Sequence, residues 1–245
     1  MSDLHTLADA VMYEGYMLWP YRRTALKNQR RWTFGGVFPP AWTTSHPDDA
    51  GLMRTQVLLS SDPRDVEVTV RFLQVTGDEG TERAVGPGPF AFPPLAGVVE
   101  VEIDGPRLTV TVRNTTPWPG GDRDDALRHA LCSTHTLLVG GRFVSATEAP
   151  GCENVGTWPV LVGDDSMLSS PIILEDHPRI APESPGDLFD GGEIDGLLAF
   201  NILALSDWEK EEMRADPRTR EILERTENLT KEQLWTLSGY RLEAE

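Results

Sequence analysis

The chain has 245 residues, of which 39% are hydrophobic and 25% are charged, and its formal net charge at pH 7 is −17. These proportions are ordinary for a globular protein, and the length suffices to bury a sizeable core. The acidic balance argues against binding nucleic acid or an anionic membrane surface, because both need a basic surface.

The N-terminus, the longest apolar run and the number of cysteines bear on the cellular compartment and on membrane insertion. The start, MSDLHTLADAV, lacks the basic and long apolar regions of a secretory signal. The longest apolar run, residues 197–205, is about half of what a membrane-spanning helix needs. Two cysteines, Cys132 and Cys152, are too few for a disulfide framework and favour free thiols. We therefore expect a cytoplasmic protein without membrane insertion. The sequence makes no prediction of an oligomeric state.

The N-terminal region, residues 1–50, is predicted to be a helical and irregular arm. Apolar residues recur at helical spacing over 3–18, and this helix should end before Pro20. A second short helix is predicted over 22–32. The glycines and prolines of residues 35–40 predict irregular structure after it.

The same arm carries what we call the basic–aromatic segment, residues 13–42. No acidic residue occurs between Glu14 and Asp48, although the whole chain is acidic. Such a segment needs a partner of opposite charge, and three remain open: a phosphate or single-stranded nucleic acid, the acidic residues 164–195 of the same chain, or an acidic protein. The candidate partner-binding residues are Tyr16, Trp19, Tyr21, Arg22, Arg23, Arg30, Arg31 and Trp32.

Residues 51–174 form the predicted β-body. Apolar and polar residues alternate over 66–72, 99–103 and 108–112, as in strands buried on one face. Asp104-Gly105-Pro106 predicts a hairpin between the last two. Residues 77–95 are rich in Gly and Pro and are predicted to be a loop, and 123–131 to hold a helical turn. Further strands are predicted at 132–139, 142–146, 157–162 and 168–174.

Short helices follow an acidic loop at 175–195. We predict a helix over 194–205, a second capped by Ser206 with Glu209, a third beginning at Asp216-Pro217, and a fourth opened by Thr230. The fold class is therefore mainly β (α+β). It is an antiparallel β-sandwich or open barrel with an N-terminal helical arm and a C-terminal layer of short helices over 194–240. We expect one domain over 1–245.

One group of residues has the composition of a transition-metal site. His129, Cys132 and His135 read H-x2-C-x2-H, and Cys152 follows after a turn. The spacing is not that of a zinc finger. If 132–139 is a strand, Cys132 and His135 point to opposite faces. The alternative is a buried free cysteine beside two unrelated histidines.

Other chemistry has weaker support. The nine carboxylates between Asp164 and Asp195 do not follow the EF-hand pattern, and they are suited to capping the helix that follows. No nucleophile elbow, P-loop or dinucleotide-binding glycine pattern is present in the sequence. Cys132 beside His129 and His135 is the one thiol–imidazole arrangement that proximity could activate.

Several sequence motifs occur together: YEGY (13–16) before PYR (20–22), STHTLL (133–138), LSSPIIL (168–174) and IAPESPGDLFDGGEID (180–195). Together they resemble an uncharacterised bacterial family encoded beside high-affinity uptake nickel–iron hydrogenases. The resemblance implies a role in making, assembling or tethering a hydrogenase, with a hydrogenase subunit or maturation factor as partner. Nickel or iron handling would fit such a role, but the Cys-x-x-Cys pairs of metallochaperones are missing from the sequence.

These observations predict a non-enzymatic accessory protein that binds another protein and needs no cofactor. The alternative is a metal- or small-molecule-binding enzyme with a site between the β-body and the acidic loop.

Overall fold

The computed structural model describes residues 2–12, 35–76, 79–149, 151–178, 202–215 and 217–230. The chain divides into two compact units, residues 1–13 with 32–179 and residues 14–31 with 180–245. Each unit is described by itself. The single domain expected from the sequence stays a prediction.

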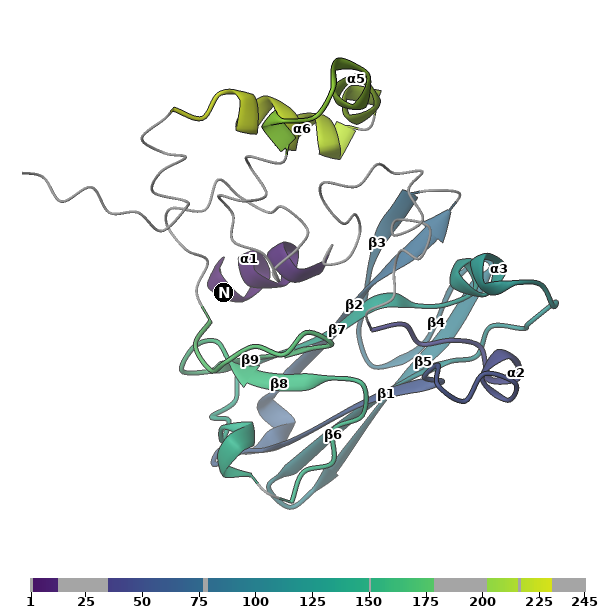
Figure 1. Ribbon diagram of the computed structural model, residues 1–245. Coiled ribbons are helices and arrows are strands. Elements are labelled where there is room, and N and C mark those ends of the chain that lie inside the picture. The colour runs from purple at the N-terminus through teal and green to yellow at the C-terminus, as the bar shows by residue number, and fades with distance from the viewer. Residues whose placement is uncertain are drawn as a thin grey trace, which may run out of the picture. The chain divides into compact units, whose positions relative to one another are not determined.

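The first unit is built on two antiparallel sheets (Figure 1), which confirms the mainly β class with few short helices. One sheet has the strand order β1-β6-β5-β4 and the other β3-β2-β7-β9-β8. The strands are β1 (Leu52–Leu58), β2 (Glu67–Thr76), β3 (Glu79–Val85), β4 (Gly88–Phe92), β5 (Leu95–Asp104), β6 (Arg107–Asn114), β7 (Cys132–Val139), β8 (Trp158–Leu161) and β9 (Ser166–Ser170).

The helical elements of this unit are short. They are α1 (Ser2–Met12), α2 (Pro40–Thr43), α3 (Arg123–Arg128) and the 3₁₀ turns η2 (Pro63–Asp65) and η3 (Ala146–Glu148). The turn predicted over 123–131 is confirmed as α3, whose capping box joins Asp122 and Asp125. No helix in the described part of the chain is long and apolar enough to cross a membrane.

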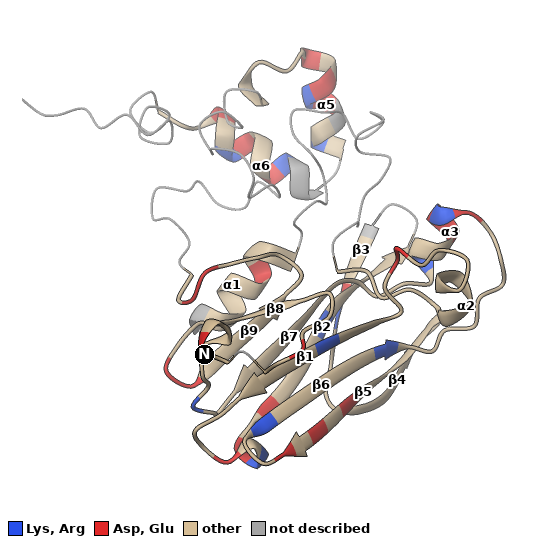
Figure 2. Ribbon diagram, turned by 60° about the horizontal axis from the view of Figure 1, so that its bottom comes forward, with Lys and Arg blue, Asp and Glu red and all other residues tan. Residues whose placement is uncertain are grey.

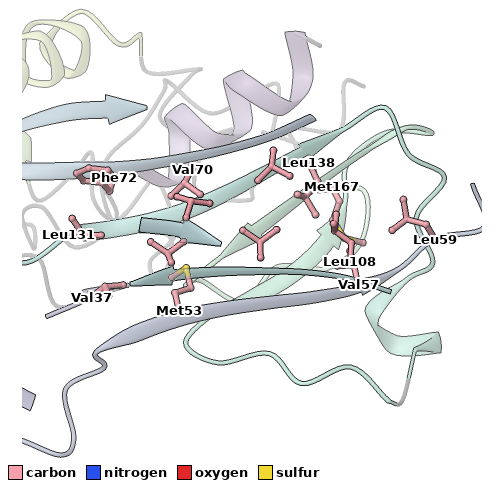
Figure 3. Close-up of a cluster of buried hydrophobic side chains, with 14 of the residues drawn as sticks. Val37, Met53, Val57, Leu59, Val70, Phe72, Leu108, Leu131, Leu138 and Met167 are labelled. Carbon is pink, nitrogen blue, oxygen red and sulfur yellow. The ribbon is translucent and has the colours of Figure 1, made fainter. Parts of the chain in front are cut away.

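The inner faces of the two sheets pack into a hydrophobic core, so the architecture is a sandwich (Figure 3). Met53 and Leu108 come from one sheet, and Phe72, Leu138 and Met167 from the other. Each is at most 2% exposed. Full burial of one such side chain stabilises the fold by about 1.5–3 kcal/mol. The alternation of apolar residues along β2, β5 and β6 is the pattern from which these strands were predicted.

The outer faces of the two sheets differ. The outer face of β5 and β6 is charged, with Glu100 accepting a 2.9 Å hydrogen bond from the Nε of Arg113 (Figure 2). The outer face of β7 and β9 is instead covered by α1, whose Leu4 and Leu7 pack against Leu137 and related residues. Strand β7 is therefore buried on both faces, and seven of its eight residues are buried.

The hairpin prediction is confirmed, because Asp104 pairs with Arg107 around Gly105-Pro106. The strand predicted over 132–139 is confirmed as β7, and that over 157–162 in the shorter form β8. The strand predicted over 168–174 is only partly right, because β9 begins two residues earlier and ends four residues earlier. Pro171 ends β9, since a proline cannot donate to the next ladder bond.

Three local predictions are wrong. Residues 77–95 contain β3 and β4, and Pro89 is tolerated because β4 is an edge strand. Residues 142–146 form no strand, and only Phe143 makes an isolated bridge, with Leu59. Pro40 begins α2, because a proline at the first position of a helix loses no intrahelical hydrogen bond.

The second unit is described at residues 202–215 and 217–230. It holds α5 (Asp207–Ala215) and α6 (Pro217–Glu227). The capping box of α5 is confirmed: the backbone N–H of Ser206 donates to Glu209 at 2.9 Å. Pro217 opens α6 as predicted. The two helices pack together, and Met213 of α5 and Leu223 of α6 are buried. The fourth helix lies outside the described residues, as does most of the first.

Candidate functional site

Strand β7 contains a β-bulge at its N-terminal end. Arg71 of β2 pairs with His135, but Leu73, two residues on, pairs with Cys132, so β7 has one residue more than β2 here. Ser133, inside the bulge, has φ +48°, a left-handed conformation that costs a non-glycine residue about 1–2 kcal/mol. Bulges and strained residues of this kind concentrate next to functional sites.

The bulge holds both ends of the charged part of the basic–aromatic segment. The Ser133 hydroxyl donates a 2.6 Å hydrogen bond to the carbonyl of Met12, the last residue of α1. The backbone N–H of Thr134 donates to the Gly35 carbonyl at 3.0 Å. Met12 and Gly35 flank residues 13–34, so the chain leaves and re-enters this unit at two adjacent residues of β7.

The re-entry point at Gly35 is sterically tight. Gly35 has φ +57°, and a Cβ there would lie 2.6 Å from the Cγ of Pro171. Only glycine satisfies both constraints. Two residues on, Val37 exchanges backbone hydrogen bonds with Leu131 at 2.8 and 3.0 Å. Gly35 to Val37 is thereby fixed along the start of β7.

His135 is fully buried beside the bulge. Its Nδ1 lies 2.8 Å from the Ser133 carbonyl, so Nδ1 carries the proton and Nε2 is left as an acceptor. No donor in the described part of the chain reaches Nε2. Burial is the main cause that lowers the pKa of His135 to about 4; the bond to Ser133 opposes this shift, and the neighbouring Arg71 adds to it. The imidazole is therefore neutral at physiological pH.

Arg71, opposite His135 on β2, connects the sheet to α1. Its Nη2 donates to Asp9 at 2.6 Å and to Glu82 of β3 at 3.1 Å. The Arg71 side chain is only 11% exposed, but the side chains of Asp9 and Glu82 are 63% and 44% exposed, so each pair contributes at most about 1 kcal/mol. The pair with Asp9 ties α1 to β2 and so helps to fix the position of Met12, whereas the pair with Glu82 joins β2 to β3.

Cys132 is buried and does not have the environment of a reactive thiol. Burial raises its pKa to about 12, and its Sγ lies 3.8 Å from the Leu127 carbonyl. The bulge also corrects the prediction that Cys132 and His135 point to opposite faces. Their partners on β2, Leu73 and Arg71, are two residues apart and share a face, so Cys132 and His135 share one too.

The other two candidate metal ligands have separate environments. His129 ends α3, and its Nδ1 lies 2.8 Å from the Asp125 carbonyl. Cys152 is a partly exposed free thiol whose pKa is raised by burial, with Arg107 opposing the shift. No group of three or more His, Cys, Asp or Glu side chains placed to hold a metal occurs within the described ranges, which include all four candidates.

The described acidic residues of 164–178 include one with a structural role. The Asp176 carboxylate accepts hydrogen bonds from the Leu161 N–H, at 2.8 Å, and from the Ser145 hydroxyl. The His177 N–H donates to the Leu161 carbonyl. Asp176 and His177 therefore satisfy backbone groups at the outer edge of β8. The remaining carboxylates, from Glu183 to Asp195, lie outside the described residues.

One cluster was missed from the sequence. The Asp49 carboxylate accepts two hydrogen bonds from Arg123, at 2.8 and 3.1 Å, and one from the Trp42 indole at 2.8 Å. His46 stacks on Trp42 with ring centroids 3.6 Å apart. Burial raises the pKa of Asp49, but the bonds from Arg123 and Trp42 outweigh it and the net shift is downward. Asp49 and Arg123 are far apart in sequence, so no local motif indicates their pairing.

The proposed partner-binding residues fall in one part of the chain. Tyr16, Trp19, Tyr21, Arg22, Arg23, Arg30, Arg31 and Trp32 all lie outside the described residues. Their pairing with the acidic residues 164–195 therefore stays a hypothesis. A scan of protein-family models and a search of curated proteins found no match to this chain.

Proposed function

We propose that this protein is a non-enzymatic accessory protein that binds another protein through its basic–aromatic segment. Following the resemblance of its motifs, we further propose that the partner is a nickel–iron hydrogenase subunit or a component of its assembly apparatus, in the cytoplasm. The role is assembly, maturation or tethering.

The observation that supports binding best is the pair of anchors at the bulge of β7. Met12 and Gly35 are bonded to the adjacent residues Ser133 and Thr134. A rigid, buried strand with both ends of a charged segment fixed to it is a scaffold of the kind that positions binding segments. The Arg, Trp and Tyr side chains of the segment are those enriched among interface anchors.

The state of the buried thiol and imidazole supports a non-enzymatic role. A Cys with a pKa near 12 holds negligible thiolate at neutral pH, and the thiolate is the nucleophile. A His with a pKa near 4 is far from the working pH of a general base. Neither group has the environment that the one nucleophilic arrangement suggested by the sequence would need.

A charge-matched pair of variants tests the proposal in the native host. In the first variant, Arg22, Arg23, Arg30 and Arg31 are changed to Gln. The control changes the same number of β-body arginines to Gln: the exposed Arg64, Arg128 and Arg142 and the half-buried Arg113. We expect affinity isolation with the wild type and the control to recover a hydrogenase subunit or maturation factor, and the first variant to lose it. Recovery of no hydrogenase component with the wild type would refute the hydrogenase assignment.

Elemental analysis separates this proposal from the enzyme alternative. The protein purified without a tag is expected to contain no stoichiometric nickel, iron or zinc. It should also gain none on titration with each metal. Stoichiometric metal that is lost in His129→Ala or Cys152→Ser would favour the metal-dependent enzyme instead.

A further inference from the structure

One end of the sandwich exposes three large apolar side chains. Val155 is 41% exposed, Trp158 52% and Ile173 71%. Trp158 pairs with Ser170 at the open end of the β8–β9 hairpin, and the chain leaves the sheet there through Pro171 toward Ile173. Val155 bridges to Arg54 at the start of β1. We call Val155, Trp158 and Ile173 the apolar end. Single exposed apolar residues are ordinary, but a gathering of them marks an interaction surface.

A small hollow opens beside the apolar end. Its volume is about 160 Å³, and its lining includes Gly35, Gly156 and Asp48. Gly156 directly follows Val155, and Gly35 lies against Pro171, two residues before Ile173, so the hollow borders the chain at both positions. Pockets for metabolites and cofactors typically measure roughly 300–1,000 Å³. A hollow of this size suits a single inserted side chain better than a small-molecule substrate.

The charge of the lining indicates which kind of side chain the hollow would accept. Two carboxylates, Asp48 and Asp49, line the hollow, and no Lys or Arg is among its lining residues. Asp49 is already paired with Arg123, whereas Asp48 is exposed. An inserted Lys or Arg would therefore have Asp48 as its partner, and its aliphatic part would lie along the glycines of the wall.

We propose that the apolar end and its hollow form a docking site for an extended segment of a second protein. The segment inserts a Lys or Arg side chain beside Asp48 and places a neighbouring aliphatic or aromatic residue on Trp158 and Ile173. A second copy of this chain is a poor occupant, because two molecules with a net charge of −17 repel each other. The site includes none of the candidate partner-binding residues of the basic–aromatic segment, since those lie between Tyr16 and Trp32 and the lining of the hollow begins at Gly35.

A random peptide library tests the site with a defined probe. Twelve-residue peptides displayed on phage are selected on the immobilised full-length protein. We expect enrichment of peptides with Lys or Arg within a few residues of Leu, Ile, Phe or Trp. The dissociation constant of the best synthetic peptide is then measured by fluorescence anisotropy. Trp158→Ser should weaken binding by about tenfold or more, as for an aromatic anchor. Asp48→Asn should weaken it and reduce its dependence on salt.

Matched variants at the far end of the β5–β6 hairpin serve as controls. Ile103 is 42% exposed and stands beside Glu102, so Ile103→Ser and Glu102→Gln repeat the same chemistry elsewhere. Both should leave peptide affinity unchanged. Ile173→Ser provides a second test should Trp158→Ser alter folding, which circular dichroism would detect. Three results would overturn the proposal: no enriched basic–apolar motif, equal binding by wild type and both apolar-end variants, or a concentration-dependent dimer that Trp158→Ser abolishes.

Discussion

Replacement of Ser133 tests the bulge that fixes the ends of the basic–aromatic segment. Ser133 is 3% exposed, has φ +48° and donates to the carbonyl of Met12. Ser133→Ala removes this bond, so the Met12 carbonyl at the end of α1 loses its donor while the strained backbone stays. We therefore expect the free energy of unfolding to fall by about 1–2 kcal/mol. Ser133→Gly loses the same bond but relieves about 1–2 kcal/mol of backbone strain. The greater conformational entropy that glycine gives the unfolded chain offsets about 0.4–1 kcal/mol of this gain.

Ser133→Gly should therefore be more stable than Ser133→Ala by roughly 0.5–1 kcal/mol. Urea unfolding measures both differences, and the melting temperature should change by roughly 2–4 °C per kcal/mol in a protein of this size. Ser60→Ala is the control, because Ser60 is exposed and its hydroxyl donates a long, 3.3 Å hydrogen bond to the Arg142 carbonyl. Equal stability of the Ala and Gly variants would refute the strain argument. An Ala variant as stable as the wild type would refute the contribution of the bond to Met12.

Three further predictions concern titratable groups. The free energy of unfolding should fall by up to roughly 3 kcal/mol as the pH falls from about 6.5 to about 4, because in this range only the unfolded state protonates His135. His135→Asn should remove this part of the pH dependence when the two proteins are compared by urea unfolding. An unchanged pH profile in the variant would contradict the prediction. A thiol reagent should label Cys152 in the native protein and Cys132 only in urea, so native labelling of a Cys152→Ser variant would contradict the burial of Cys132. Asp49→Asn should lower the free energy of unfolding, measured in urea, by about 1–3 kcal/mol, whereas Asp48→Asn should lower it little. Equal effects of the two variants would refute the role of the bond to Arg123.

The local fold was predictable wherever one face of a strand is buried and the other exposed. Alternation along β2, β5 and β6 and the turn at Gly105-Pro106 led directly to the right strands and hairpin. β3 and β4 were missed because their Gly and Pro residues are tolerated by pairing with a neighbour and by an edge position, neither of which is a local property.

The candidate site was only partly predictable. The sequence singled out Cys132 and His135 by residue type, and both lie at the bulge. It could not indicate that Ser133 has a positive φ, because serine has no preference for that conformation. The alternation of side chains along a regular strand predicted the wrong relative orientation of Cys132 and His135, since the residue inserted at the bulge reverses that alternation.

The amino-acid sequence alone was enough to establish an acidic chain, a basic–aromatic segment with no acidic residue after Glu14, and those strands and helices that periodicity and capping residues predict. The packing of the chain brought Met12 and Gly35 to adjacent residues of β7, paired Asp49 with Arg123, and placed Gly35, Asp48 and Gly156 around one small hollow. Periodicity and capping act between residues a few positions apart. These contacts join residues tens of positions apart, and their partners are selected when the two sheets pack and bury their shared core.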